Sequence, residues 1–215
     1  MSDKNNRSPD EIEIEQPESL RRLTVPTREF KGPGKHLIDL GLALIPVLVI
    51  YWTVNITSDF VIKRSLYLMI TLVLCAIIYP FSKKSSPFKI SMVDMVIILL
   101  SILGSLYVMY DYNSRFMRLG EPTTMDMVFG VIMLVIGLDI GRRAIGWALT
   151  LVSLGLLAYG YFGNYIPGHF GHGGFLLSTM VGHIFCGMEG YYGMATKFMT
   201  RYIVPFILLG AFLEK

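Results

Sequence analysis

The chain consists of long apolar runs separated by short polar or glycine-rich segments. Five of these runs reach, or nearly reach, the roughly 17–25 apolar residues with which a helix crosses a bilayer. A sixth apolar run lies near the end of the sequence. The six runs are residues 37–54, 64–80, 91–110, 125–140, 145–162 and 202–213. This pattern predicts an all-α, polytopic integral membrane bundle of about six transmembrane helices.

Acidic residues stand at the beginnings of several runs, where they are expected to cap helices. Ser91 is followed three residues later by Asp94, and Thr123 is followed three residues later by Asp126, as in a capping box. Asp39 is expected near a helix N-terminus, where the helix dipole favours a negative charge. A charge costs less at the end of a span than at the bilayer centre. We therefore interpret all three acids as caps rather than as parts of an ion pathway.

Lysine and arginine residues are distributed unevenly between the two sides of the predicted bundle. If the N-terminal tail lies inside, twelve of them lie in inside segments and four in outside segments. The inside residues are Lys4, Arg7, Arg21, Arg22, Arg28, Lys31, Lys35, Lys83, Lys84, Lys89, Arg142 and Arg143, and the outside residues are Lys63, Arg64, Arg115 and Arg118. Lys197 and Arg201 are not counted, because their side depends on the fold after Phe175. The bias predicts a cytoplasmic N-terminus.

With the N-terminus inside, five crossings place the loop 164–174 outside. This loop is rich in glycine and aromatic residues, which is typical of an ordered loop anchored at the membrane interface. Residues 175–190 are amphipathic and interrupted by glycine, which favours a short interfacial or re-entrant helix over a span. The last run is then expected to cross back inward.

Composition supports a membrane location and a polar tail. Charged residues make up only 16% of the chain, hydrophobic residues make up 53%, and the mean hydropathy is +0.54. A soluble domain carries about 25% charged residues. Residues 1–36 are polar and lack the apolar core of a signal peptide, so we expect a disordered cytoplasmic tail. The two cysteines, Cys75 and Cys186, form no visible disulfide framework.

Few side chains suggest chemistry. His169 and His172 lie in the glycine-rich loop without a third metal ligand at a suitable spacing, so we interpret them as surface or headgroup-level residues. His183, Cys186 and Glu189 recur every third residue, and on a helix they would drift across one face. That spacing fits a polar stripe touching other helices better than it fits a metal or proton-relay site. Glu189 and His183 are nevertheless the two weak candidates for contact with a substrate or ion.

Two further features lie near the end of the fourth run. Asp139 can pair with Arg142 and Arg143 along one helix face, which predicts anchoring at the inside membrane edge. Gly137 and Gly141 form a G-x-x-x-G pattern, which permits close helix approach.

Several function classes lack their motifs. The chain has no phosphate-binding G-x-x-x-x-G-K-[ST] loop, which leaves an ATP-driven pump unsupported. It has neither a G-x-S-x-G nor an H-E-x-x-H sequence. No basic, aromatic-interleaved surface indicates nucleic-acid binding.

Several segments resemble the fused membrane permeases of the tripartite ATP-independent periplasmic (TRAP) transporter family. The resemblance extends over about residues 37–215, although Met188 stands where that family leads us to expect a small polar residue. The segments are 141–149 (GRRAIGWAL), 157–163 (LAYGYFG), 165–168 (YIPG), His183, Glu189-Gly190, Gly193 and 208–215 (LLGAFLEK).

The resemblance implies a division of the chain into four parts. Residues 1–36 form the disordered tail, 37–141 a four-helix small-subunit-like domain, 142–163 a connecting transmembrane helix, and 164–215 the start of a large permease domain. The family implies a multi-pass protein of the bacterial inner membrane that uses a sodium gradient to import organic acids. Its expected partners are a periplasmic solute-binding protein, the remaining large permease domain and the lipid bilayer, with no nucleic acid.

The same resemblance implies limits on what this chain does by itself. The family's sodium and substrate sites lie in sequence beyond Lys215, so no transport-site residue is assigned here and no other cofactor is expected. The chain is expected to be a fragment or a split gene product that does not transport alone. A non-transport scaffold or assembly subunit is the main alternative. A membrane enzyme using His169, His172, His183 and Glu189 ranks third, because no reaction-specific constellation is present.

Overall fold

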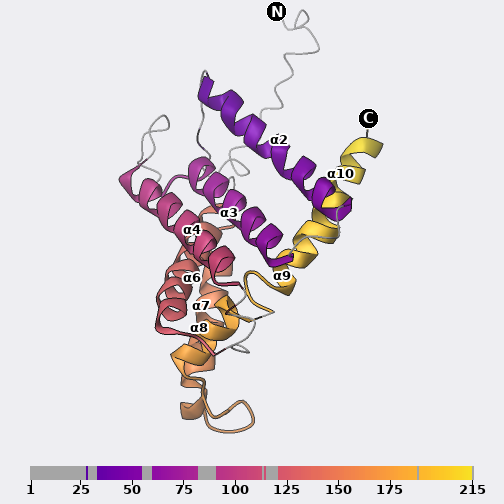
Figure 1. Cartoon of the computed structure of the whole chain (residues 1–215). Coiled ribbons are helices and arrows are strands. Elements are labelled where there is room, and N and C mark those ends of the chain that lie inside the picture. The colour runs from indigo at the N-terminus through magenta and orange to yellow at the C-terminus, as the bar shows by residue number, and fades with distance from the viewer. Residues whose placement is uncertain are drawn as a thin grey trace, which may run out of the picture.

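The computed structural model describes residue 28 and residues 33–54, 60–81, 91–112, 114, 121–187 and 189–214. All regular secondary structure in these ranges is helical, which confirms the all-α prediction (Figure 1). The elements are α2 (Pro33–Val54), α3 (Phe60–Ile78), α4 (Met92–Tyr110), α6 (Thr124–Ala144), α7 (Trp147–Phe162), the 3-10 turn η2 (Gly163–Tyr165), α8 (Leu177–Phe185), α9 (Met194–Phe198), the π-helical turn η3 (Met199–Ile203) and α10 (Val204–Leu213).

Four helical segments are long and apolar enough to cross a membrane. They are α3, α4, α6 and the continuous run Met194–Leu213, which joins α9, η3 and α10. The apolar part of α2, Ile38–Trp52, is shorter, and α7 has 16 residues. The structure therefore supports a membrane protein with four candidate spans among the described residues. The number six and the side of the N-terminus stay predictions.

Small side chains bring α3 and α4 close together. Ser65 on α3 and Ser101 and Ser105 on α4 are fully buried, as is Ala76 on α3. In membranes, small residues at helix interfaces let backbones approach and pack, because lipid supplies no hydrophobic driving force between helices. Next to this pair, α6 packs against α4, where Met133 of α6 lies against the backbone of Gly104.

The remaining helices surround this centre on two sides. Helix α8 packs against α6, and its Phe185 joins a core with Val108, Met133, Ile136 and Ile140. On the other flank, α10 and η3 pack against α2, and α9 contacts α3 (Figure 1). No residue of α10 is buried, and five of its large apolar side chains are exposed: Phe206, Ile207, Leu209, Phe212 and Leu213. An apolar outer surface of this kind suits a lipid environment.

The N-terminal boundary differs from the predicted one. Helix α2 begins at Pro33, so residues 33–36 are helical and the prediction of a disordered tail through residue 36 is wrong there. Proline is well tolerated in a first helical turn, where its missing N–H would be unpaired in any case. Arg28 is also ordered and buried. The other residues of the predicted tail lie outside the described ranges.

The junction between α6 and α7 also differs from the prediction. Helix α7 begins at Trp147 rather than at residue 145, because Gly146 adopts φ 109°, a conformation that interrupts the helix and that side-chain-bearing residues rarely adopt. Helix α6 continues to Ala144, so the division expected between residues 141 and 142 falls inside it. The division into four parts stays a prediction.

The last two predicted elements are present in altered form. The predicted short helix within residues 175–190 is α8, although its position in a membrane stays a prediction. The last apolar run begins at Met194, eight residues before the predicted start. Its π-helical turn ends at Ile203, two residues before Pro205, which has no N–H to donate to the preceding turn.

Candidate functional site

One end of α3, α4 and α6 contains a buried ionic cluster centred on Asp94. The Asp94 side chain is completely buried and forms ion pairs with both Arg28 and Arg143. The Arg143 Nη1 lies 2.6 Å from Asp94 Oδ1. Arg28 also donates its backbone N–H to the carbonyl of Ile78, at 2.9 Å. The cluster thus connects Arg28, five residues before the start of α2, to the end of α3 and to two further helices.

The cluster continues along the last turns of α6. Asp139 Oδ1 lies 2.7 Å from Arg142 Nη2, and Asp139 Oδ2 lies 2.5 Å from Arg143 Nη2. These two ion pairs confirm the predicted pairing along one helix face. The Arg142 guanidinium also lies 5.2 Å from the ring centre of Phe81 and 5.3 Å from that of Trp147. We call Arg28, Asp94, Asp139, Arg142 and Arg143 the ionic cluster. Each of its carboxylates pairs with two guanidiniums, as buried charges require, although Arg28 Nε and Arg143 Nε make no hydrogen bond with the described residues.

The capping predictions have three different outcomes. Thr123 and Asp126 form the predicted capping box, with the Thr123 N–H donating to Asp126 at 3.0 Å. Ser91 makes no side-chain cap bond, and Asp94 serves the ionic cluster instead. Asp39 lies beyond the first turn of α2, because that helix begins earlier than predicted. The interpretations of Asp94 and Asp39 as caps are therefore wrong.

Helix α8 approaches α6 closely at Gly130, a glycine outside the predicted G-x-x-x-G pattern. A Cβ at Gly130 would overlap Val181 and Phe185 of α8. At Gly137 the nearest neighbour is the Tyr191 ring, whereas Gly141 has nothing within 4 Å among the described residues. The predicted contact through both Gly137 and Gly141 is thus wrong for Gly141. Burial of the Tyr191 phenol raises its pKa above the usual value.

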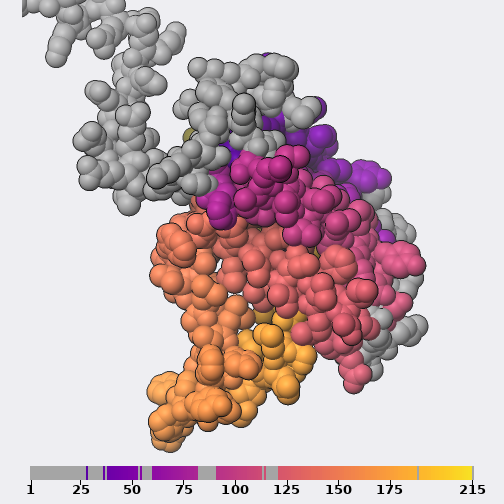
Figure 2. All heavy atoms as spheres, turned by 90° about the vertical axis from the view of Figure 1, so that its left-hand side faces the viewer, coloured from indigo at the N-terminus to yellow at the C-terminus, as the bar shows by residue number. Residues whose placement is uncertain are grey.

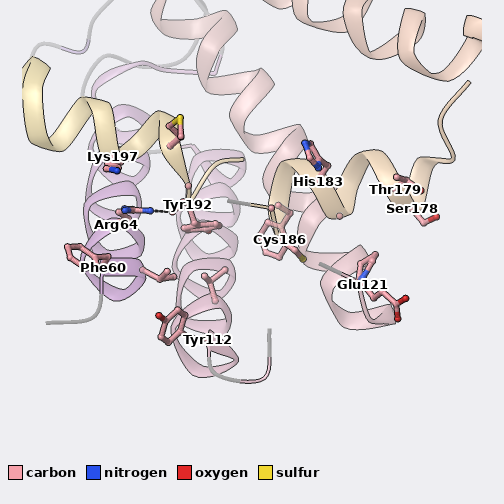
Figure 3. Close-up of a pocket in the computed structure, with 18 residues that line it drawn as sticks. Phe60, Arg64, Tyr112, Glu121, Ser178, Thr179, His183, Cys186, Tyr192 and Lys197 are labelled. Carbon is pink, nitrogen blue, oxygen red and sulfur yellow. Dashed lines mark hydrogen bonds between the residues drawn. The ribbon is translucent and has the colours of Figure 1, made fainter. Parts of the chain in front are cut away.

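At the other end of the bundle, a cavity of about 810 Å³ is lined by residues of α3, α4, α8 and α9 and of the turns between helices (Figure 3). Its wall includes His183 and Cys186 from α8 and the turn that follows it. Apolar side chains from four elements provide much of the remaining surface: Val61, Val108, Phe185, Tyr192 and Met194. Figure 3 draws Arg64 and Lys197 on one side of the cavity, and Glu121 on the opposite side.

The two weak candidates, His183 and Glu189, are neighbours but do not form an enclosed site. Their side chains are 70% and 73% exposed, with His183 Nε2 3.6 Å from Glu189 Oε2. Helix α8 ends at Phe185, so Glu189 lies in a turn and the interpretation of one helical stripe is wrong for it. His183 and Cys186 line the larger cavity, and Glu189 does not.

One of the two loop histidines, His172, packs against neighbouring residues. Figure 2 shows the orange segment that contains this loop projecting from the body of the protein. His172 stacks edge-on with Tyr159, with ring centres 4.9 Å apart, and its Nδ1 accepts the Gly174 N–H at 3.2 Å. His169 is exposed. Their position at the headgroup level stays a prediction. Within the described ranges, no three His, Cys, Asp or Glu side chains are grouped to hold a metal ion.

A smaller cavity of about 260 Å³ adjoins the larger one, with Phe60, Arg64 and Lys197 in both walls. Four cationic side chains line it, and none of its described wall residues is acidic. Its complete wall is Val49, Trp52, Phe60, Lys63, Arg64, Lys197, Thr200 and Arg201. We call Lys63, Arg64, Lys197 and Arg201 the cationic group.

The sequence analysis missed the cationic group. Lys63 and Arg64 are adjacent, and Lys197 and Arg201 are four residues apart, but more than 130 residues separate the two pairs. Only the packing of α9 against α3 brings them to one cavity. Two contacts fix the first pair: Lys63 Nζ approaches the Trp52 carbonyl at 3.5 Å, and Arg64 Nη1 donates to the Tyr192 carbonyl at 3.4 Å.

Comparison with known proteins adds no identification. No family model, no curated protein and no solved structure matches the chain.

Proposed function

We propose that this chain is a membrane permease component of a TRAP-type secondary importer. An importer of this type uses an ion gradient, sodium in that family, to take up organic acids that a periplasmic binding protein delivers. The helical architecture with four candidate spans supports a role inside a membrane. The choice of this family depends on the sequence segments that resemble its permeases.

The observation that carries the proposal is the position of those segments at structural junctions. The segment 141–149 covers the end of α6, the Gly146 turn with its positive φ, and the start of α7. The segment 165–168 forms the turn after η2, in which Gly168 also has a positive φ, 89°. Such backbone positions require particular residues, whereas a lipid-facing helix surface accepts almost any apolar sequence.

The proposed role is structural within a larger machine. The charged side chains of α3, α4 and α6 lie near helix ends, in the cationic group, the ionic cluster and the capping box. None is assigned to the transported substrate or to the coupling ion. Under this proposal, the remaining permease domain supplies those sites, and the bacterial inner membrane is the location of the complex.

Reconstitution tests the proposal. The gene for this chain is expressed in a bacterial host together with its neighbouring permease and binding-protein genes, and proteoliposomes are assayed with a panel of labelled carboxylic acids. We expect no uptake with this chain alone. Uptake is expected when the remaining permease and the binding protein are present, and it should depend on an inward sodium gradient. Unchanged uptake after removal of this chain from the assembled system would contradict the proposal.

A scaffold without a transport role is the second candidate. The observation that favours it is the outward apolar surface of α10, none of whose residues is buried. Affinity purification of the tagged chain from native membranes separates the two candidates. A stable complex with a larger permease and gradient-driven uptake supports the importer, whereas a complex with other membrane proteins and no uptake supports the scaffold.

A further inference from the structure

The two adjoining cavities differ in chemistry in a way that matches an amphiphilic ligand. The smaller cavity gathers four cations, and no described residue of its wall carries a negative charge. The larger cavity adds apolar side chains such as Val61, Val108 and Met194. We propose that together they bind one anionic phospholipid, with its phosphate in the smaller cavity and one acyl chain along the apolar wall of the larger. This inference is independent of the proposed transport role.

Charge is the first argument. Lysine and arginine side chains near a membrane surface attract anionic lipid headgroups. At the opposite end of α6, the arginines of the ionic cluster have carboxylates as partners. The cavity wall around Lys197 and Arg201 offers no carboxylate of that kind among the described residues, since Glu121 lies on the far side of the larger cavity (Figure 3). An anionic ligand in this cavity would lie against the cationic side chains of its wall.

Size and shape are the second argument. Pockets for drug-sized molecules measure roughly 300–1,000 Å³, so a volume of about 260 Å³ suits a compact group such as a phosphate with part of its glycerol. The shared wall of Phe60, Arg64 and Lys197 allows a ligand to extend from one cavity into the next. A small soluble anion would bind in the smaller, cationic cavity and would not fill the larger cavity with its apolar wall.

Depth in the membrane is the third argument. Phe60 begins α3 and Met194 begins the last apolar run, so the cationic group lies near the ends of two candidate spans. Span ends lie near the membrane interface, where phospholipid phosphates are found. Trp52 and Phe60 line the same cavity, and tryptophan in particular is enriched at interfacial depth.

Native mass spectrometry of the full chain tests the assignment. The protein is purified in a neutral detergent, stripped of lipid, and titrated with dioleoyl phosphatidylglycerol or dioleoyl phosphatidylcholine. We expect one phosphatidylglycerol to be retained at concentrations where phosphatidylcholine is not. The Lys197→Gln/Arg201→Gln variant is expected to weaken phosphatidylglycerol binding by about fivefold for each cation removed. Arg142→Gln, which removes a cation at the opposite end of the bundle, should bind like the unaltered protein.

Three results would overturn the proposal. They are equal retention of both lipids, an undiminished phosphatidylglycerol adduct in the double variant, and displacement of that lipid by millimolar inorganic phosphate or succinate. The last result would assign the cationic group to a soluble anion. If the double variant fails to fold, Arg201→Gln alone replaces it, because Arg201 is exposed and its loss removes no core packing.

A fluorescence measurement supplies an independent readout. Trp52 and Trp147 are the two tryptophans of the chain, and only Trp52 lines the smaller cavity. In a Trp147→Phe background, phosphatidylglycerol should change the emission of Trp52, which lies beside the proposed phosphate position, more than phosphatidylcholine does at the same concentration. Equal changes in emission with the two lipids would contradict a headgroup-selective site.

Discussion

The charged side chains at the two ends of the bundle have different surroundings. At the end formed by the close of α3, the start of α4 and the close of α6, the ionic cluster pairs arginine with aspartate in the interior. At the other end, the cationic group lines a cavity without a described acidic residue in its wall. A paired buried cluster constrains structure, whereas cationic side chains around an open space can receive an anionic ligand. The comparison therefore separates the structural end of the molecule from the end for which we propose a lipid site.

Removal of the central carboxylate is the most severe test of the structural end. Asp94→Ala leaves Arg28 and Arg143 buried without their shared partner, and loss of one partner from a buried ion pair costs about 3–5 kcal/mol. We expect the free energy of unfolding, measured by SDS titration in mixed micelles, to fall by that amount. Asp94→Asn, which keeps the shape, should recover only part of it. A loss below about 1 kcal/mol for Asp94→Ala would show that the cluster does not hold this end together.

Helix α6 provides the next test, because two of its glycines, Gly130 and Gly141, have opposite surroundings. A Cβ at Gly130 would overlap Val181 and Phe185, so Gly130→Ala should lower the free energy of unfolding by about 1–3 kcal/mol. Gly141→Ala is the matched control, since no atom of the described residues lies within 4 Å of a Cβ added there. It should raise stability by about 0.5–1 kcal/mol, because alanine favours a helix interior. Equal effects in the same titration would disprove the close packing of α8 on α6.

The capping box at the cavity end should have a smaller effect. Thr123→Ala removes the side-chain oxygen that accepts the Asp126 N–H, and loss of such a cap costs about 1 kcal/mol. Ser91→Ala is the paired control at the ionic end, where no side-chain cap bond is present, and its effect should be close to zero. The same SDS titration measures the free energy of unfolding of both variants. Equal losses of that free energy would contradict this difference between the caps.

The exposed pair beside the larger cavity should have the smallest effect. Glu189→Gln removes a carboxylate that is 73% exposed and 3.6 Å from His183, and exposed ion pairs contribute about 0.2–1 kcal/mol. The expected change in unfolding free energy is therefore below about 1 kcal/mol, and raising the salt concentration should reduce it further. A loss as large as that of Asp94→Ala would place an essential contact at the cavity end and break the contrast between the two ends.

Local patterns predicted local structure well and long-range contacts poorly. The apolar runs located the helices, and the spacing of Thr123 and Asp126 predicted a capping box that is present. The same spacing at Ser91 and Asp94 led to a wrong interpretation, because a carboxylate in a first turn looks identical in sequence whether it caps the helix or binds a distant arginine. Arg28 and Arg143 lie 66 and 49 residues away from it.

The cavity end was harder to predict for the same physical reason. Lys63 and Arg64 suggested only an outside loop, and the position of Lys197 depended on the fold after residue 175. The packing of α9 on α3 places both pairs at one cavity, on the end where the charge bias predicts the outside. Likewise, Gly130 had no pattern to distinguish it from Gly141, because what decides its role is the helix that packs on it.

The π-helical turn at Met199–Ile203 sets the rotational phase between the two halves of the last span. A π turn holds about one residue more than an α turn, and one residue corresponds to about 100° of rotation around a helix axis. Side chains after Ile203 are therefore offset by that angle from the positions that an uninterrupted α-helix starting at Met194 would give them. Deleting one residue within this turn would restore α-helical winding and rotate Lys197 relative to Phe206, so a helical wheel drawn through the whole span misplaces one of its halves.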